Sequence, residues 1–409
     1  MNNSLPTPPE TAQPPAESAG KLFLRFLRFG LLAWGGPVAQ IDMIRHELVE
    51  EEKWISPAHF KRLLAIYQVL PGPEAHELCV HFGVLARGRW GGVLAGLGFM
   101  LPGFVLMFLL SWLYLSLQLT ATAFQAVFLG IQPAVIALIV RACHRIGRHA
   151  LTDTPLWIVA ILAAAAQLLG VSFWITLSFA GAGYVVAARR RWWGAVGVAL
   201  VFAAVAFVAS PVLAGREPFV PVTAVETPPA ARHTGQAGTG ELFGSGLRAG
   251  LLTFGGAYTA IPFLKHDAVE RGRWMTERDF LDGVALSGIL PAPLIIFSTF
   301  VGYFGGGPWG ALAMTLGVFL PAFGFSLLFH RQLEAVMAIS WLKHVLDGVT
   351  AGVVGLIVVT TIGLARTAVP NLPAAGIGVV ALLAAYRWKS KFAIPFIMLA
   401  AGLAGVALF

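Results

Sequence analysis

The chain has 409 residues, of which 57% are hydrophobic and only 12% are charged, and its mean hydropathy is +0.77. A soluble core cannot enclose this much apolar surface, so the composition excludes a soluble globular protein and predicts an all-α polytopic membrane protein. The formal charge of +8 would suggest nucleic-acid binding in a soluble protein, but the basic residues form short clusters between apolar runs and therefore indicate membrane topology.

The elements expected in chain order begin with a disordered cytoplasmic tail at 1–20, which is rich in Pro, Ser, Thr and Glu and lacks the basic start of a signal peptide. Apolar runs of about 20 residues then predict thirteen membrane spans. The first seven lie near 22–41, 63–86, 91–119, 121–140, 154–170, 171–188 and 192–213. After a linker at 214–240, six more lie near 241–263, 283–304, 309–329, 344–364, 372–386 and 392–409.

Lysine and arginine placement predicts a cytoplasmic N-terminus and a periplasmic C-terminus. The loops near 120, 170 and 306, which would then be outside, carry no basic residue, whereas the opposite loops carry several. Segment 42–62 departs from this pattern, because it would lie outside with four basic residues, although five acidic residues outweigh them.

The second half of the chain repeats the first. Residues 34–54 recur 220 positions later, and the match includes the pairs Arg28 and Arg248, Gly35-Gly36 and Gly255-Gly256, Trp54 and Trp274, and Pro71-Gly72-Pro73 and Pro291-Ala292-Pro293. The repeats are expected at 21–188 and 241–409, with an additional transmembrane helix within 189–213. Seven spans separate their starts, and because seven is odd, the repeats should have inverted topology, as in many secondary transporters.

These paired glycine, tryptophan and proline motifs resemble the chromate ion transporter (CHR) family in its long two-domain form. The resemblance implies a protein of the bacterial inner membrane that exports chromate and confers chromate resistance, with sulfate as a look-alike substrate. The second copy departs from the first at Ala257 and Ala292, where the first copy has Pro37 and Gly72. The two copies therefore need not contribute equally to a site.

Glycine and proline breaks inside apolar runs are the candidate substrate site. A broken helix leaves backbone amides free, and these can bind an oxyanion, although small residues that allow close helix packing are the simpler explanation for most intramembrane glycines. Arg28 and Arg248 precede the glycine pairs by about two turns and could contact the same anion, or could extend to the membrane interface. The predicted substrate-binding residues are Arg28, Gly35, Gly36, Pro37, Gln40, Pro71, Gly72, Pro73, Arg248, Gly255, Gly256, Pro291 and Pro293.

Three titratable residues are candidates for proton coupling. Glu74 follows the PGP break, where it could titrate in the transport path or simply cap a helix. His46 and His266 occupy matching positions beside Arg45 and Lys265, and these four side chains could form a vestibule that attracts anions, or a solvated charged face. Ser56-Pro57 and Thr276-Glu277 predict helix starts before each proline break.

The mechanism expected is alternating access, in which one copy rocks against the other around a shared site. The alternatives are a sulfate carrier with incidental chromate transport, and a non-transporting membrane enzyme or scaffold. No cofactor or metal is expected: the two cysteines lack metal-ligand spacing, and the histidines of 76–81 are five residues apart and do not share a helix face. The partners expected are chromate and the lipid bilayer, with sulfate and a second copy of the chain as further candidates.

Overall fold

The computed structural model describes residues 17–116, 122–189, 192–210, 237–329, 339–388 and 390–409, and these residues form helices without a strand. Four helices are long and apolar enough to cross a membrane, namely α4 (Glu74–Ser116), α5 (Thr122–Ala150), α12 (Phe297–Phe329) and α14 (Ser340–Ala368). Five shorter apolar helices are α6 (Thr154–Leu168), α7 (Phe173–Ala188), α8 (Trp192–Ala209), α15 (Leu372–Arg387) and α16 (Ala393–Leu408). This content agrees with a membrane protein. The predicted tail and linker fall almost entirely outside the described residues.

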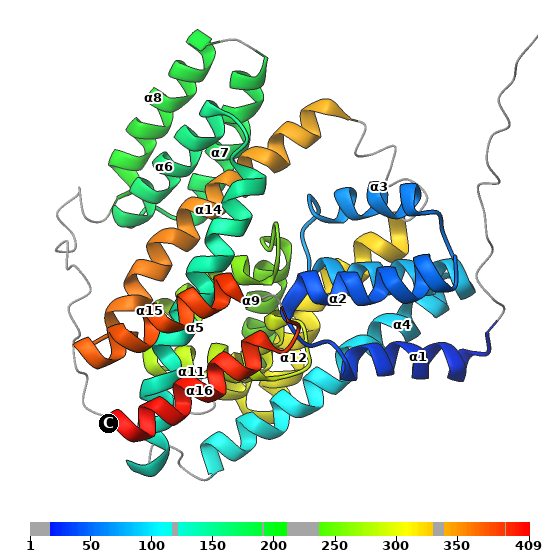
Figure 1. Ribbon diagram of the computed structural model, residues 1–409. Helices are drawn as coiled ribbons and strands as arrows, with labels where there is room; N and C mark the ends of the chain where they lie inside the picture. The colour runs from blue at the N-terminus through cyan, green and yellow to red at the C-terminus, as the bar shows by residue number, and fades with distance from the viewer. Residues whose placement is uncertain (1–16, 117–121, 190–191, 211–236, 330–338, 389) are drawn as a thin grey trace, which may run out of the picture.

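The first expected span, 22–41, is wrong as a single crossing. It consists of α1 (Ala19–Leu31) and α2 (Gly36–Ile44), and α2 continues as the π-helix η1 (Arg45–Glu51). Arg25 Nη1 lies 3.1 Å from Glu47 Oε1, so α1 and η1 lie side by side and the chain reverses at 32–35. Figure 1 shows α1 and α2 as this antiparallel pair. Hydropathy indicates that both segments are apolar, but it carries no information on chain direction.

Three further expected spans are also hairpins. Span 63–86 joins the end of α3 (Pro57–Tyr67) to the start of α4 across 68–73, and the rings of Phe60 and Phe82 stack with centroids 6.4 Å apart. In the second copy, α9 (Thr239–Leu251) reverses at 252–256, since Arg248 Nη2 lies 2.8 Å from Asp267 Oδ2. The elements after this reversal are η2 (Ala257–Ala260), α10 (Ile261–Lys265) and η3 (His266–Arg271), and α11 (Glu277–Ile289) then meets η4 (Leu294–Ile296) across 290–293.

The helices α4 and α12 each fold back on themselves at matching places. The backbone leaves helical geometry at Arg87–Gly88 and at Gly306–Gly307. A Cβ on Gly83 would lie 2.4 Å from the carbonyl oxygen of Gly91, so the two limbs of α4 touch through their backbones, as glycine allows. The second limbs therefore form the expected spans 91–119 and 309–329. The thirteen expected spans thus become four broken hairpins and nine continuous apolar segments.

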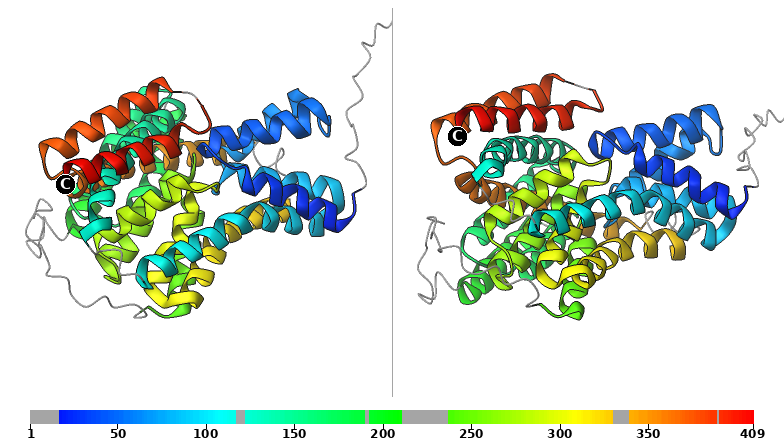
Figure 2. Two further views of the ribbon diagram at one scale, coloured as in Figure 1. Left: turned by 60° about the horizontal axis from the view of Figure 1, so that its bottom comes forward. Right: turned by 90° about the horizontal axis from the view of Figure 1, so that it is seen from below.

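The helices form two bodies, and each body contains elements of both copies (Figures 1 and 2). The hairpin body comprises residues 19–116 and 239–329, where α1 packs on α4, α9 on α12, and α4 on α12. The bundle body comprises residues 122–209 and 340–408, where α5 packs on α15 and α16, and α14 packs on α6 and α7. Each body thus contains helices of both copies, and the expectation that one copy rocks against the other stays a prediction.

Candidate functional site

The four hairpin tips, at 32–35, 68–73, 252–256 and 290–293, meet between the two copies. The amide of Gly72 donates to the carbonyl of Thr253 at 2.8 Å, and Pro71 forms an isolated β-bridge with Phe254. The buried Gln40 side chain donates from Nε2 to the carbonyls of Ala33 at 2.9 Å and Ala292 at 3.1 Å. The structure therefore brings the glycine and proline breaks of both copies to one place.

The glycine pairs have backbone conformations that explain why glycine stands there. Gly35 and Gly36 have φ of +87° and +78°, and Gly255 and Gly256 have φ of +74° and +119°. Such values are unfavourable for residues with a Cβ. In each copy the pair reverses the chain and precedes the next short helix, whose first backbone amides have no partner within the helix.

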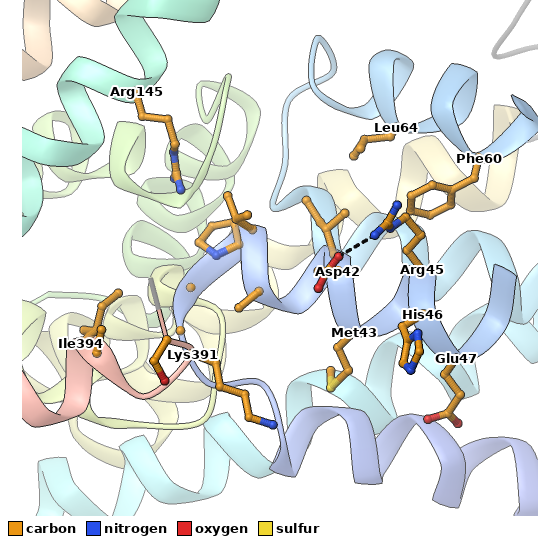
Figure 3. Close-up of a pocket in the computed structure, with 18 of the residues that line it drawn as sticks. Asp42, Met43, Arg45, His46, Glu47, Phe60, Leu64, Arg145, Lys391 and Ile394 are labelled. Atoms are coloured by element: carbon orange, nitrogen blue, oxygen red, sulfur yellow. Dashed lines mark hydrogen bonds and ion pairs between the residues drawn. The ribbon is translucent and has the colours of Figure 1, made fainter. Parts of the chain in front are cut away.

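A cavity of about 1380 Å³ lies between the two bodies and reaches the tip at Gly35 and Gly36 (Figure 3). It is bounded on one side by α2, η1 and α3 of the hairpin body, and on the other by α5, Trp388 and residues 390–394 of the bundle body. On the far side of this tip a much smaller cavity is lined by Gly35, Gly36, Ser287, Gly288 and Ala292. The first-copy tip thus separates the large cavity from the second-copy tip 290–293.

Three basic side chains line the inner part of the cavity, and in the sequence they belong to the short basic clusters that indicate membrane topology. Arg141 and Arg145 come from α5, and Lys391 comes from the loop before α16. Figure 3 shows Arg145 and Lys391 near the tip of the α2 hairpin. Within the described part of the chain, none of the three has a carboxylate within 4.0 Å. The spacing of Arg141 and Arg145, one helical turn apart on one face, was the available sequence signal.

Arg28 and Arg248 occupy equivalent positions and make equivalent ion pairs. Arg28 pairs with Glu47, and Arg248 pairs with Asp267, which stands 220 positions after Glu47. Neither arginine lines the cavity. In this conformation both hold a hairpin together, and their contact with an oxyanion stays a prediction.

The matched pairs Arg45-His46 and Lys265-His266 differ in their surroundings. Arg45 and His46 line the mouth of the cavity, where a hydrogen bond to Glu50 raises the pKa of His46. Lys265 is only 9% exposed and its Nζ lies 3.2 Å from Glu270 Oε1 and 3.0 Å from Glu277 Oε1. The first pair therefore lies in a vestibule, whereas Lys265 joins η3 to α11.

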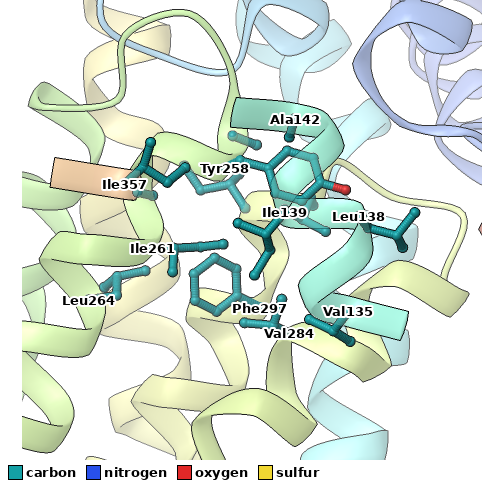
Figure 4. Packing of buried hydrophobic residues seen from close by; sticks show 14 of the residues in the cluster. Val135, Leu138, Ile139, Ala142, Tyr258, Ile261, Leu264, Val284, Phe297 and Ile357 are labelled. Carbon is teal, nitrogen blue, oxygen red and sulfur yellow. The ribbon is translucent and has the colours of Figure 1, made fainter. Parts of the chain in front are cut away.

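The same asymmetry holds for the hairpins themselves. In the second copy, α11 packs against α5, α14 and α16, and η2 and α10 pack against α14. In the first copy, α3 makes its main contacts with α4 and η1, and α2 with α4 and η1. Figure 4 shows Tyr258 of η2 packed beside Ile139 and Ala142 of α5. The second-copy hairpins are therefore docked on the bundle body, and the cavity occupies the corresponding space on the first-copy side.

The helices before each proline break begin as the sequence predicts. The side chain of Ser56 accepts a hydrogen bond from the amide of His59, and Thr276 forms a capping box with Asp279. Glu74 is the first residue of α4 and is 8% exposed at the tip 68–73. These caps fix where each hairpin limb starts, and hence where the tip lies.

A helical membrane protein with a cavity that ends at broken helices between two bodies has the architecture of a transporter rather than of an enzyme. The sequence profile of the family described as "Chromate transporter" matches residues 20–187 and again residues 240–406. The chain therefore belongs to the chromate transporter family, in its long two-domain form.

Relatives of similar length include the Chromate transport protein of Pseudomonas aeruginosa, which is 58% identical over 402 residues and covers 97% of this chain and 94% of the relative. The Chromate transport protein of Cupriavidus metallidurans is 29% identical over 410 residues, covering 98% of this chain and 97% of the relative. The Probable chromate transport protein of Synechococcus elongatus is 29% identical over 403 residues, with 96% of each chain covered. No solved structure matches the chain.

Proposed function

We propose that this protein exports chromate across the bacterial inner membrane by alternating access and so confers chromate resistance. The observation that carries the proposal is the cavity, whose inner end is lined by Arg141, Arg145 and Lys391 and reaches a junction built by the hairpin tips of both copies. The acidic residues that line the cavity, Asp42, Glu47, Glu50 and Glu51, lie on its α2 and η1 wall. The names of the full-length relatives support chromate as the substrate.

The oxyanion site is placed at the inner end of the cavity. The amides at Gly35 and Gly36 stand at the start of α2, where free N–H groups and the helix dipole favour an anion. Arg141, Arg145 and Lys391 supply positive charge without a competing carboxylate within ion-pair distance among the described residues. These groups can neutralise a tetrahedral dianion, and the arginines can bind two of its oxygens at once.

In the proposed alternating-access cycle, the two states differ in which copy has its hairpins packed on the bundle body. In this structure the second-copy hairpins pack on the bundle body through η2, α10 and α11, whereas the first-copy hairpins approach it at the tip, where Gly35 lies against Lys391. Five of the nine continuous segments, namely the second limb of α4 and α5 to α8, separate the starts of the two copies. Five is odd, so the copies are inverted, and docking the first copy while releasing the second would open a cavity on the other side of the membrane.

The proposed export direction agrees with the side of the membrane to which the cavity opens. With a cytoplasmic N-terminus, the cavity mouth at Arg45 and His46 faces the cytoplasm, because η1 lies beside the start of α1. Moving two negative charges out of a negative interior yields about 4.6 kcal/mol per 100 mV of membrane potential.

The experiment that tests the function is counterflow in proteoliposomes that contain the purified protein, with the membrane potential clamped. Labelled chromate should accumulate when unlabelled chromate is trapped inside. Equal accumulation driven by trapped sulfate would assign the protein as a general oxyanion carrier, and the absence of chromate counterflow would contradict the proposal.

The inverted arrangement is tested by labelling the two helix reversals. In a protein with Cys79 and Cys143 replaced by alanine, Gly88→Cys and Gly307→Cys each place a thiol where no atom lies within 4 Å of the added Cβ. An impermeant thiol reagent added to whole cells should modify the cysteine at 307 and spare the one at 88. Modification of both from the same side would contradict inverted topology.

A further inference from the structure

Glu77 is a buried carboxyl group without a hydrogen-bond partner. It lies one turn into the first limb of α4, is 0% exposed, and neither of its carboxylate oxygens has a hydrogen-bond partner among the residues that the structure describes. The carboxyl group packs against the tip 68–73, since a Cβ on Gly72 would lie 3.0 Å from its Cδ and Oε1 atoms. The carboxyl group therefore lies directly beneath the junction where the two copies meet.

The fold does not need an acid at this position. The second copy places Ile296 and Phe297 in the corresponding part of η4 and α12, and both are fully buried. An ionised carboxylate in such surroundings, with no donor to replace water, costs many kcal/mol, whereas the protonated acid costs far less. Intramembrane carboxyl groups that carry this cost are generally functional. Glu77 therefore holds a proton in the conformation seen here.

The groups around Glu77 reinforce this protonation state. Glu74, three residues earlier on the same helix, is a second buried carboxyl group and offers Glu77 no positive charge. On the same limb His76 is enclosed by the rings of Phe319 and Phe323. No basic side chain makes an ion pair with Glu77 among the described residues.

A polar chain leads away from the backbone of Glu77. Ser326 Oγ of α12 lies 3.3 Å from the carbonyl oxygen of Glu77 and 3.2 Å from Tyr67 Oη. Tyr67 Oη in turn lies 3.0 Å from His81 Nδ1. These groups come from α3, α4 and α12, so they join the first-copy hairpin to the second copy.

We propose that Glu77 is a proton-binding site that loads together with the anion, so that one proton moves with each chromate in the same direction. This inference rests on the proposed transport function. A dianion at the neighbouring tip opposes ionisation of Glu77, so the loaded carrier keeps its proton. When the anion has left and the tip separates from Thr253, water can reach the carboxyl group and take the proton. The loaded carrier then moves a net charge of −1 instead of −2.

The test measures charge and protons together in wild-type proteoliposomes. At zero pH gradient, the chromate gradient at equilibrium should be roughly 50-fold per 100 mV for a net charge of −1, but roughly 2,000-fold for −2. A pH dye trapped in the lumen should show about one proton entering or leaving with each chromate. Chromate flux without proton flux, or proton flux in the opposite direction, would overturn the inference while leaving chromate transport itself intact.

The variant Glu77→Gln mimics the protonated acid and should carry chromate without protons, with the steeper voltage dependence of a −2 charge. Glu77→Asp keeps a carboxyl group and should retain proton flux with a shifted pH profile. A wild-type proton-to-chromate ratio in Glu77→Gln would overturn the assignment, as would loss of the proton in Glu74→Gln alone. The absence of chromate flux in the wild type would instead contradict the proposed function.

Discussion

Gly35 and Gly36 are adjacent residues of one tip, and alanine substitution at each in turn distinguishes the effect of backbone strain from the effect of packing. Both have positive φ, at +87° and +78°, so alanine at either position carries a similar strain of about 1–2 kcal/mol. At Gly36 the nearest atom to an added Cβ is Ile394 Cδ1 at 3.8 Å, which is ordinary contact. At Gly35 the added Cβ would lie 2.7 Å from the carbonyl oxygen of Lys391 and 2.9 Å from its Cα, so the tip and the bundle body must move apart.

We therefore expect Gly36→Ala to lower the rate of chromate counterflow by no more than roughly 5- to 30-fold, which is the effect of the strain alone. Gly35→Ala should lower it further, because the backbone of residue 391 cannot rotate away as a side chain can. The assay is the initial rate of counterflow, normalised to the amount of protein reconstituted, together with the half-life of each purified variant on heating. Equal losses in the two variants would refute the contact between the tip and the backbone of Lys391.

Two other matched comparisons test the cavity and the docked hairpin. Arg145→Gln removes a charge from the inner cavity and should raise the KM for chromate several-fold, with a larger effect at low salt. The control is Arg148→Gln, which lies outside the cavity and should leave the KM unchanged. Equal KM values in both variants would argue against an anion path along α5. Lys265→Met breaks a largely buried ion pair and should lower the free energy of unfolding in detergent by about 3 kcal/mol. Adding Glu277→Gln should restore part of this free energy, because it removes the carboxylate that the first substitution leaves unpaired. Arg45→Met, whose partners are exposed, should cost at most about 1 kcal/mol, and a similar loss in both variants would contradict the docking asymmetry.

The sequence located the breaks correctly but not the path of the chain through them. The helix starts at Ser56 and Thr276 and the interruptions at the glycine pairs lie where capping and backbone preferences placed them. The span at 22–41 was nevertheless predicted to cross the membrane. Hydropathy reports how apolar a segment is, and a re-entrant hairpin is as apolar as a crossing helix. The contacts of Arg25 and Arg28 with Glu47 show that the chain returns.

The sequence by itself determined that the protein is a membrane protein, that it contains two copies of one repeat, and that glycine pairs interrupt both copies at the same place. These features can be read without the fold, because composition, repetition and backbone preference are properties of the chain itself. The tertiary structure decided which residues surround the junction. Arg145 joins the cavity because α5 packs beside the first-copy hairpins, and Glu77 is left without a partner because α12 of the other copy covers it. Such neighbours come from segments far apart in the chain, so their roles depend on packing that no local pattern records.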